Sequence, residues 1–507
     1  MNLSLHLQRT ALRKPEAPAV ALGDSVLLTY EALAERAARL ATALPETYSL
    51  SPGDRVAVIT PNCPEYLELL YGIWHAGLIA VPVNAKLHQK EYAHILSDVD
   101  ASLVFVSESL HGLVAACAPA SCPLSVIGSP DYAALFDAPT SAITDRASED
   151  IAWIFYTSGT TGLPKGACLT HRNLLTMCHC YRADVDPSPP WRAILHAAPM
   201  SHGSGLYGLA YVMEGGVHVI PASGGFDPDE IFDLVEAWPG TAFFAAPTMV
   251  RRLTAHPRPA PGTPLRTIIY GGGPMHVEDC LAALHKFGPK LAQLYGQGES
   301  PMTITALPAA DHMVEGSPAP RERLGSVGVA QSAVEVRTIT PEGQPCAPGE
   351  IGEIVVRGDS VMRGYWNNPA ATEETLKDGW LHTGDMGVFD AAGYLTLKDR
   401  SKDVIISGGQ NIYPREVEEV LLQHPAVAEV AVLGAPDREW GERVEAYLTL
   451  TPGEKADTAA LDAFCLEHLA RFKRPKRYHV LESLPKNDTG KVLKRALRKR
   501  MKAALGA

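Results

Sequence analysis

The sequence predicts an α/β protein with two domains of unequal size. Through residues 29–299, short β-branched runs alternate with segments of helix length, a pattern typical of layered, mostly parallel sheets. From about residue 325, strand-like segments separated by Gly and Pro indicate a β-rich subdomain of the same N-terminal domain. A compact stretch beyond residue 399 has the pattern of a small α+β domain. We therefore expect domains at 1–399 and 400–507.

The elements of the N-terminal domain follow from side-chain periodicity. Residues 29–44 repeat apolar side chains at helical spacing behind Thr29, a suitable N-cap, and predict an amphipathic helix. Thr170 is expected to cap another helix that runs to about Tyr181, whereas residues 117–149 predict a loop-rich excursion. The predicted strands are 55–60, 79–84, 102–107, a run that starts at Ile151, 192–200, 216–221, 241–248, 265–275 and 290–299.

The C-terminal domain is expected to begin with a helix. Pro414 is well placed for the first helical turn, and an apolar stripe follows it. Strand-like runs at 427–434 and 443–450 and a helix near 458–470 complete the predicted unit.

Composition excludes several classes of protein. With 507 residues, 46% hydrophobic and 20% charged, the chain has the balance of an ordinary globular protein. No apolar run approaches the ~20 residues that span a bilayer, and the N-terminus lacks a signal-peptide core. We therefore expect a cytoplasmic protein without an integral membrane segment. The net charge of -12 argues against a general nucleic-acid binder.

The cysteines do not indicate disulfides or zinc. Nine cysteines are scattered without a repeated spacing, which argues against a disulfide framework. The run Cys178-His179-Cys180 lacks the second ligand pair that a structural zinc site requires.

The stretch IFYTSGTTGLPKGA at 154–167 predicts a loop that holds a polyphosphate. Glycines allow the backbone to approach phosphate closely, hydroxyl groups donate hydrogen bonds, and a lysine supplies a positive charge. Because Pro164 precedes Lys165 and Gly166 follows it, the spacing is not that of a Walker A loop. The candidate phosphate-binding residues are Thr157, Ser158, Gly159, Thr160, Thr161, Gly162 and Lys165.

This loop resembles the signature loop of the adenylate-forming superfamily. That superfamily contains acyl-CoA and aryl-CoA synthetases, the adenylation domains of nonribosomal peptide synthesis, and firefly luciferase. Its loop embraces the pyrophosphate end of ATP. Four further segments match the superfamily in the same order, so that the resemblance covers residues 154–495.

The first of these segments, YGQGE at 295–299, resembles the family motif Y-G-x-T-E. The resemblance implies that Tyr295 stacks on adenine and that Glu299, with Thr160, binds Mg²⁺, an ion that prefers oxygen ligands. Gly298 departs from the motif, which puts the usual threonine contact to the α-phosphate in doubt. The expected nucleotide contacts here are Tyr295, Gly296, Gln297 and Gly298.

Two further segments imply ribose contacts and a hinge. In GWLHTGD at 379–385, Asp385 would accept hydrogen bonds from both ribose hydroxyls. Arg400 would contact ribose or phosphate, and Lys402 would absorb the rotation of the small domain. The loop that would then approach the pantetheine thiol of CoA consists of Ser407, Gly408 and Gly409.

The last motif, PKNDTGK at 485–491, implies that Lys491 is the catalytic lysine. A cation between a carboxylate and the α-phosphate stabilises the charge-rich displacement state. The basic run at 491–502 is interpreted as a solvated helix beside this lysine, and attraction of CoA phosphates stays open.

Two weaker segments concern the acid. His202, in a segment that resembles P-x-x-H-x-x-G, would border the acyl pocket and the carboxylate, and we group it with Lys491 and Glu299 as catalytic. A turn like G-G-A-P would lie against adenine and the pocket floor, through Gly272, Gly273 and Pro274.

Together these motifs predict an ATP-dependent carboxylic acid:CoA ligase that uses ATP, Mg²⁺ and CoA. The acid would form an acyl-adenylate with release of pyrophosphate, and CoA would then take the acyl group as a thioester. Positions near His202, Tyr207, Phe244 and Gly271 suggest an apolar acyl or aryl tail. Because no carrier segment follows Lys491, free CoA is favoured over a phosphopantetheine carrier protein. A nucleotide-binding homologue without turnover and a homodimeric state stay open.

Overall fold

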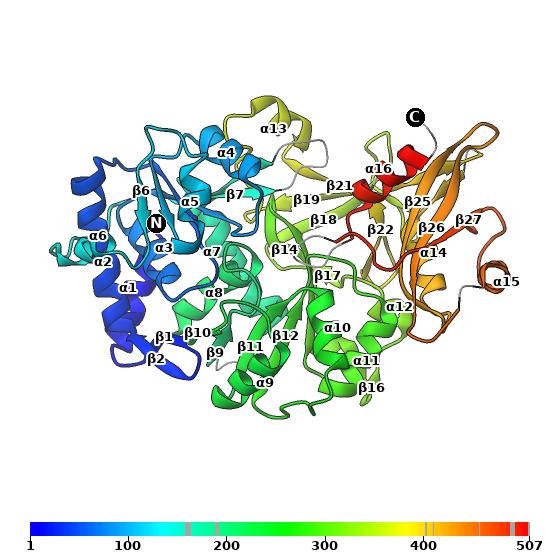
Figure 1. Cartoon of the computed structure of the whole chain (residues 1–507), viewed down its shortest axis with the longest axis horizontal. Helices are drawn as coiled ribbons and strands as arrows, with labels where there is room; N and C mark the ends of the chain where they lie inside the picture. The colour runs from blue at the N-terminus through cyan, green and yellow to red at the C-terminus, as the bar shows by residue number, and fades with distance from the viewer. Residues whose placement is uncertain are drawn as a thin grey trace.

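The structure is a computed structural model and describes residues 1–157, 164–187, 192–400, 403–408, 410–455, 457–486 and 492–504, without the side chains of residues 399, 400, 502 and 504. Figure 1 shows a large α/β body with a smaller C-terminal unit beside it. The body combines two layered, largely parallel sheets with a β-rich part, which confirms the predicted fold class. The boundary near residue 400 stays a prediction.

The first large sheet has six strands in the order β6-β5-β3-β4-β7-β8. All its pairs are parallel except β7–β8, which is antiparallel. Residues 165–167, expected in the phosphate loop, belong to β8, whose apolar side chains are buried. The strands are β3 (Arg55–Ile59), β4 (Ile79–Val83), β5 (Leu103–Val106), β6 (Leu124–Val126), β7 (Ile151–Thr157) and β8 (Lys165–Thr170).

The second large sheet has nine strands in the order β17-β14-β13-β12-β11-β9-β10-β1-β2. Its central strands β10, β9, β11, β12 and β13 are parallel, so their carboxyl ends share one edge. The strands are β1 (Pro18–Leu22), β2 (Ser25–Thr29), β9 (Ala193–Leu195), β10 (Val217–Ile220), β11 (Thr241–Ala245), β12 (Leu265–Tyr270), β13 (Leu291–Gln297), β14 (Ser300–Leu307) and β17 (Val329–Ala330).

Helices cover these sheets, and one buried apolar cluster joins both of them. That cluster includes Trp153 of β7, Ile269 of β12 and Tyr211 of the helix α8. Thr29 caps the first predicted helix by accepting from Ala32 N at 3.3 Å. The helices of the body are α1 (Ser4–Arg13), α2 (Tyr30–Tyr48), α3 (Glu65–His75), α4 (Gln89–Asp98), α5 (Glu108–Ala115), α6 (Pro130–Ala134), η1 (Leu135–Asp137), α7 (His171–Cys180), η2 (Tyr181–Val185), α8 (Gly203–Glu214), α9 (Pro228–Ala237), α10 (Pro247–Ala255), α11 (Val277–Phe287), η3 (Ala309–His312), α12 (Arg321–Leu324) and α13 (Pro369–Thr375).

The β-rich part forms a five-stranded sheet in which β18, β19, β21 and β20 follow one another and β22 pairs with β21. All its pairs are antiparallel, which explains the short Gly- and Pro-containing connections in the sequence. Its strands are β18 (Val334–Ile339), β19 (Gly352–Gly358), β20 (Leu376–Lys377), β21 (Trp380–Phe389) and β22 (Leu395–Arg400), and a separate hairpin is formed by β15 (Met313–Val314) and β16 (Ser317–Pro318).

The C-terminal unit has its own five-stranded sheet and its own apolar core. It contacts the body beside α10 and α11, where Arg251 pairs with Glu429 at 2.5 Å and His276 Nδ1 lies 3.0 Å from Glu419 Oε1. Its elements are β23 (Ile405–Ser407), β24 (Gln410–Ile412), α14 (Pro414–Leu421), β25 (Val427–Asp437), β26 (Gly441–Leu450), α15 (Thr458–His468), β27 (Arg477–Val480) and α16 (Lys494–Ala504).

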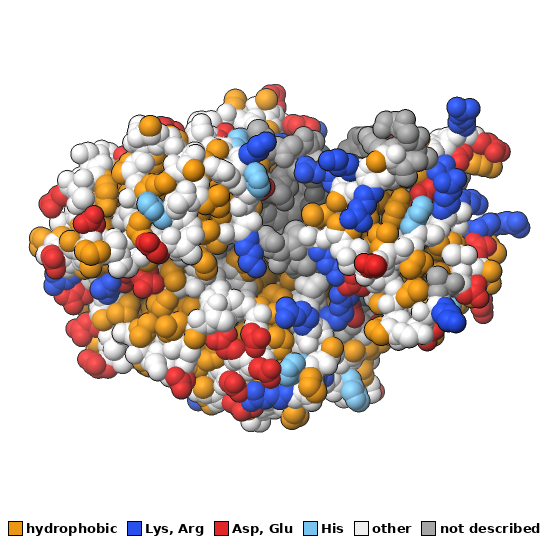
Figure 2. Space-filling view, viewed as in Figure 1, with side chains coloured by type: hydrophobic (Ala, Val, Ile, Leu, Met, Phe, Trp, Pro, Cys, Tyr) orange, Lys and Arg blue, Asp and Glu red, His pale blue; other side chains and the backbone are white. Residues whose placement is uncertain are grey.

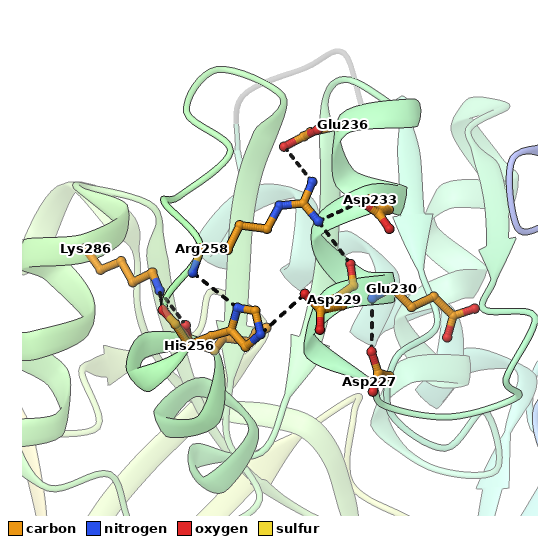
Figure 3. Close-up of polar contacts among 9 residues, drawn as sticks. Asp227, Asp229, Glu230, Asp233, Glu236, His256, Arg258 and Lys286 are labelled. Atoms are coloured by element: carbon orange, nitrogen blue, oxygen red, sulfur yellow. Dashed lines mark hydrogen bonds and ion pairs between the residues drawn. The ribbon is translucent and has the colours of Figure 1, made fainter.

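Surface charge differs between the parts of the molecule. On the face shown in Figure 2, Lys and Arg side chains gather where the C-terminal unit meets the body. An acidic cluster at α9 has a structural role: Figure 3 shows Arg258 reaching Asp233 at 2.6 Å and Glu236 at 3.1 Å, while His256 faces Asp229. These contacts tie α9 to the segment that follows α10.

None of the helices in the described ranges has the length and apolar character needed to cross a membrane.

Candidate active site

Glu299 lies between β13 and β14 and is held by two hydroxyl groups. Its Oε1 accepts a hydrogen bond of 2.6 Å from Tyr365 and one of 3.4 Å from Thr157, the last residue of β7. Its backbone carbonyl accepts from Met362 N at 2.7 Å. Burial and the charge of Glu299 raise the pKa of Tyr365, so its hydroxyl stays protonated and donates. The carboxylate is therefore positioned at the strand that leads into the phosphate-holding loop.

The structure describes the two ends of that loop. Lys165 opens β8, and its Nζ lies 5.1 Å from the ring centroid of Tyr365. Lys165 and Glu299 therefore contact the same tyrosine, one at its ring and one at its hydroxyl. The predicted phosphate-binding residues Ser158, Gly159, Thr160, Thr161 and Gly162 lie outside the described residues.

The residues around Glu299 fit the magnesium ion that the resemblance implies. Mg²⁺ is usually held by one or two carboxylates together with waters and substrate phosphates. Glu299 supplies one such carboxylate, with the hydroxyl of Thr157 beside it. Within the described ranges, no group of three or more His, Cys, Asp or Glu side chains could hold a metal ion. Phosphate and water oxygens, together with the hydroxyl of Thr160 that the resemblance implies, would complete the coordination.

Asp385, in β21, is an acceptor for two side chains from β13. The Tyr295 hydroxyl donates to Asp385 Oδ2 at 2.8 Å, and Gln297 Nε2 donates to the same oxygen at 2.7 Å. Gln297 also donates to the Thr383 carbonyl at 3.0 Å. The backbone of Arg400 in β22 is the strand partner of Asp385. The structure thus brings the expected adenine and ribose residues together, although it does not describe the Arg400 side chain.

The glycines of the YGQGE segment are required by close packing. A Cβ atom on Gly298 would overlap Thr157 Cγ2 and would lie 2.9 Å from Phe155 Cδ1. A Cβ atom on Gly296 would lie 2.7 Å from Met302 N. Phe155 and Thr157 therefore occupy the space that a threonine side chain at position 298 would need. Gly298, the residue that departs from the family motif, therefore fits against the side chains of the neighbouring strand β7.

His202 lies at the N-terminal end of α8 and faces Phe155. The two rings are 5.2 Å apart, edge to face, and His202 Nδ1 lies 2.9 Å from Ser201 Oγ. Burial lowers the pKa of His202 to about 4, so the imidazole is neutral near pH 7. A Cβ atom on the next residue, Gly203, would lie 2.8 Å from Met302 Cε and 3.1 Å from Phe244 Cε1. His202 therefore stands beside an apolar wall.

The turn after β12 lies at the carboxyl end of that strand, where ligands gather in open α/β sheets. Gly272 has a φ of +77°, which disfavours other residues, and a Cβ atom there would lie 3.9 Å from Phe244 Cζ. A Cβ atom on Gly271 would lie 2.8 Å from the Leu294 carbonyl of β13. Gly272, Gly273 and Pro274 therefore continue the wall that begins at Phe244.

Two of the residues expected near CoA are described in the C-terminal unit. Ser407 ends β23 and pairs with Gly441. Gly408 has a φ of +58°, its N–H donates to the Trp440 carbonyl at 2.8 Å, and a Cβ atom there would lie 2.7 Å from Trp440 Cε3. The Trp440 side chain is 52% exposed. Lys402, Gly409 and Lys491 lie outside the described residues.

Three site residues were not predicted from the sequence. Tyr365 lies in a loop after β19, and no local pattern indicates that it reaches Glu299. Phe155 has the pattern of an ordinary strand residue, although period-two alternation places it on the same face as Thr157. Trp440 follows a turn in which Asp437 accepts from its N–H at 3.1 Å, and its exposure could not be foreseen.

Comparison with known proteins agrees with this geometry. Residues 7–366 match the family model described as AMP-binding enzyme, and residues 416–491 match the AMP-binding enzyme C-terminal domain. A feruloyl-CoA synthase from Amycolatopsis is 39% identical over 97% of both chains. A long-chain-fatty-acid–CoA ligase from Bacillus subtilis is 34% identical over 97% of this chain and 93% of its own.

Solved structures share the whole fold. The o-succinylbenzoate-CoA synthetase of Bacillus subtilis, in complex with its acyl-adenylate intermediate, has a TM-score of 0.85 at 31% identity and covers 97% of both chains. ATP-bound MatB from Rhodopseudomonas palustris has a TM-score of 0.88 at 30% identity and covers 99% of both chains. The chain therefore belongs to the AMP-binding enzyme family, in its branch of adenylate-forming acyl-CoA and aryl-CoA ligases.

Proposed function

We propose that this ligase activates a carboxylic acid with a largely apolar aryl or acyl tail and transfers it to CoA. The observation that carries the proposal is a pair of acceptor carboxylates at the YGQGE segment, one of which is Glu299 of the segment itself and the other Asp385. Asp385 is bonded to Tyr295 and Gln297, and Glu299 is bonded to Tyr365 and Thr157. The carboxylate of Asp385 suits a ribose diol, and the carboxylate of Glu299 suits a phosphate-bound cation. The names of two relatives, a feruloyl-CoA synthase and a long-chain-fatty-acid–CoA ligase, support an acid with an apolar tail.

Binding of ATP would use the body of the protein. The Tyr295 ring would lie against adenine beside the 272–274 turn, while Asp385 would accept hydrogen bonds from the ribose hydroxyls. Arg400 would add a positive charge on the ribose or phosphate side. Thr157 and Lys165 stand at the two ends of the loop that would close over the pyrophosphate.

In the first half-reaction, a carboxylate oxygen of the acid attacks the α-phosphorus, and the bond to pyrophosphate breaks. Magnesium, held by Glu299 and Thr160, would neutralise phosphate charge when bound. Lys491 would place its ammonium beside the attacking carboxylate and the α-phosphate, where negative charge crowds in the transition state. His202, neutral near pH 7, would border the carboxylate without adding charge.

In the second half-reaction, the CoA thiolate attacks the acyl carbon of the adenylate, and AMP leaves. We assign the change between half-reactions to a rotation of residues 400–507 about Lys402, which would withdraw Lys491 and bring in the 407–409 loop. Half-exposed Trp440 covers Gly408 and presents an apolar ring beside that loop. Its indole would pack against the incoming pantetheine arm.

Half-reaction assays of Lys491→Ala test the assignment. Pyrophosphate release should fall by about 100-fold or more, because the charge acts in the adenylation transition state. Thioester formation from supplied acyl-adenylate should be largely retained. Lys499→Ala, which changes an exposed lysine of α16, serves as the matched control and should affect neither step. Equal losses in both half-reactions of Lys491→Ala would refute the assigned role.

A carrier protein is the alternative acceptor, because a fatty acid–[acyl-carrier-protein] ligase from Streptomyces coeruleorubidus is 36% identical to this chain over 97% of it and 94% of its own length. Steady-state thioester formation with CoA and with a phosphopantetheinylated carrier protein separates the two. Preference for the carrier protein would overturn CoA as the acceptor. ATP binding without carboxylate-dependent pyrophosphate release would instead support a non-catalytic homologue.

A further inference from the structure

A chain of three polar side chains is buried beneath α8. His196 Nδ1 lies 2.8 Å from Ser204 Oγ, and His196 Nε2 lies 3.0 Å from His218 Nδ1. The two imidazole rings are stacked, with centroids 5.2 Å apart and planes 12° apart. All three residues have 0% exposure. Burying polar groups in an apolar core is unfavourable unless their hydrogen bonds are satisfied, so this chain requires an explanation.

The chain lies on the same sheet face as the apolar wall of the active site. β9 has β10 on one side and β11 on the other. Side chains alternate along β10, so His218 points to the sheet face opposite that of Val217 and Val219. Because Ala242 pairs with Ile194, Phe244 lies in register with His196 two residues further on and points to the same face as His218. His196, the residue that follows β9, and Phe244 of β11 are therefore neighbours at the carboxyl edge of the sheet.

Two glycines of helix α8 lie over Phe244, His196 and His218. Gly203 stands over Phe244, with a Cβ position 3.1 Å from Phe244 Cε1. Five residues later, Gly208 stands over the imidazoles, with a Cβ position 3.1 Å from His218 Cε1 and 3.3 Å from His196 Cε1. Ser204 follows His202 by two residues on the same helix. The polar chain thus begins within about one helical turn of the histidine expected at the carboxylate.

The chain is one hydrogen-bond partner short. Two neutral imidazoles and one hydroxyl carry three hydrogens, of which two are used between the three residues. The third is on His218 Nε2 or on Ser204 Oγ, depending on which way the chain is oriented. His218 Nε2 is buried without a hydrogen-bond partner. Leaving a buried polar group unpaired costs ~1–3 kcal/mol.

We propose that Ser204, His196 and His218 form a specificity element that binds a hydroxyl group at the far end of the acid's aryl or acyl tail. This inference rests on the proposed function. A hydroxyl both donates and accepts, so it satisfies the chain in either orientation. Burial keeps both rings neutral, because it lowers the pKa of His196 to about 3 and the pKa of His218 below its usual range. Neutral rings favour a hydroxyl over a second carboxylate.

Matched acids that differ by one hydroxyl test the proposal. Pyrophosphate release would be measured for cinnamic against 4-hydroxycinnamic acid and for octanoic against 8-hydroxyoctanoic acid. In at least one pair, the wild-type enzyme should prefer the hydroxylated acid by about tenfold or more in kcat/KM, since a site built to bind a hydroxyl discriminates against its absence. Ser204→Ala and His218→Leu should bring that ratio close to one.

The outcomes separate this inference from the proposed function. No pyrophosphate release with any acid would refute the proposed function. Release with ratios near one in the wild type, as an internal water at His218 would produce, would refute only the hydroxyl site. An unchanged preference in Ser204→Ala would do so as well, and this small substitution keeps the test valid if His218→Leu does not fold. His179→Leu, at an exposed histidine of α7, is the matched control and should keep the wild-type ratio.

Discussion

Phe155 and Gly298 are sterically complementary: a Cβ atom on Gly298 would lie 2.9 Å from Phe155 Cδ1. The same atom would overlap Thr157 Cγ2, and Thr157 donates to Glu299 at 3.4 Å. A side chain at position 298 would therefore displace the strand end that supports the carboxylate. The glycine is a fitted part of this site, so the absence of the usual threonine does not by itself indicate a loss of activity.

Restoring the family threonine should therefore impair this enzyme. We expect Gly298→Thr to lower kcat/KM for MgATP by about tenfold or more, because overpacking a close-packed site costs ~1–3 kcal/mol. The double variant Gly298→Thr/Phe155→Ala should recover part of the loss by freeing space. Pyrophosphate-release kinetics provide the measurement. Higher activity of Gly298→Thr than of the wild type would show that the threonine contact is missing.

Asp385→Asn should weaken ATP binding severely. The carboxylate accepts from both Tyr295 and Gln297 on one oxygen, and an amide nitrogen in that position would face two donors. If the amide oxygen of the Asp385→Asn variant instead faced Tyr295 and Gln297, its NH₂ group would point toward the expected ribose hydroxyls and could not accept from them. We expect KM for ATP to rise by about 10- to 100-fold, since hydrogen bonds to charged groups are worth ~1.5–3 kcal/mol. Asp390→Asn, at an exposed turn, is the control, and equal effects of both variants would contradict the assignment.

Tyr365→Phe tests whether the orientation of Glu299 matters. The substitution removes the 2.6 Å hydrogen bond and keeps the ring against which Lys165 lies. We expect KM for MgATP to rise about five- to tenfold, with little change in KM for the acid. Titration of Mg²⁺ at fixed ATP would show a matching rise in the concentration required. Tyr394→Phe, which loses a 3.3 Å bond to Asp311 away from the site, should leave both constants unchanged.

Periodicity predicted the fold class and most of the strands along the chain, because buried strands and amphipathic helices leave strong patterns. The helix behind Thr29 and the helix behind Thr170 both form, and each threonine caps as expected. The strand predicted at 192–200 is only Ala193–Leu195, because the chain then turns toward α8. After Leu195 the Asn62 side chain takes the place of a neighbouring strand, because its Nδ2 donates to the carbonyls of His196 at 2.7 Å and Ala198 at 2.9 Å.

The site was partly predictable, since local motifs identify Tyr295, Glu299 and Asp385. What the motifs could not supply is which distant residues complete each contact. Tyr365 reaches Glu299 across 66 positions of sequence, and Tyr295 reaches Asp385 across 90. Tyr365 is placed by the pairing of its segment with β8, through a bridge to Ala167. Tyr295 meets Asp385 because the β-rich part packs against the nine-stranded sheet there. The buried histidine pair was not foreseen for the same reason, because His196 follows β9 whereas His218 lies in β10.

Acidification should destabilise the protein through histidines that are buried as neutral rings. His312 is fully buried and contacts the Tyr270 hydroxyl at 2.9 Å, and burial lowers its pKa to about 4. In the unfolded chain this pKa is ~6.5, so below that pH the unfolded state binds a proton that the folded state does not. Stability should therefore fall as pH drops from about 6.5 toward 4, by up to ~3 kcal/mol for this residue, and should not depend on it above pH 7. Thermal unfolding of the wild type, of His312→Gln and of the exposed-site control His285→Gln between pH 7.5 and 4.5 measures the effect. The Tm of His312→Gln should fall less steeply with acid than that of the other two proteins, and three parallel slopes would exclude His312 as a contributor.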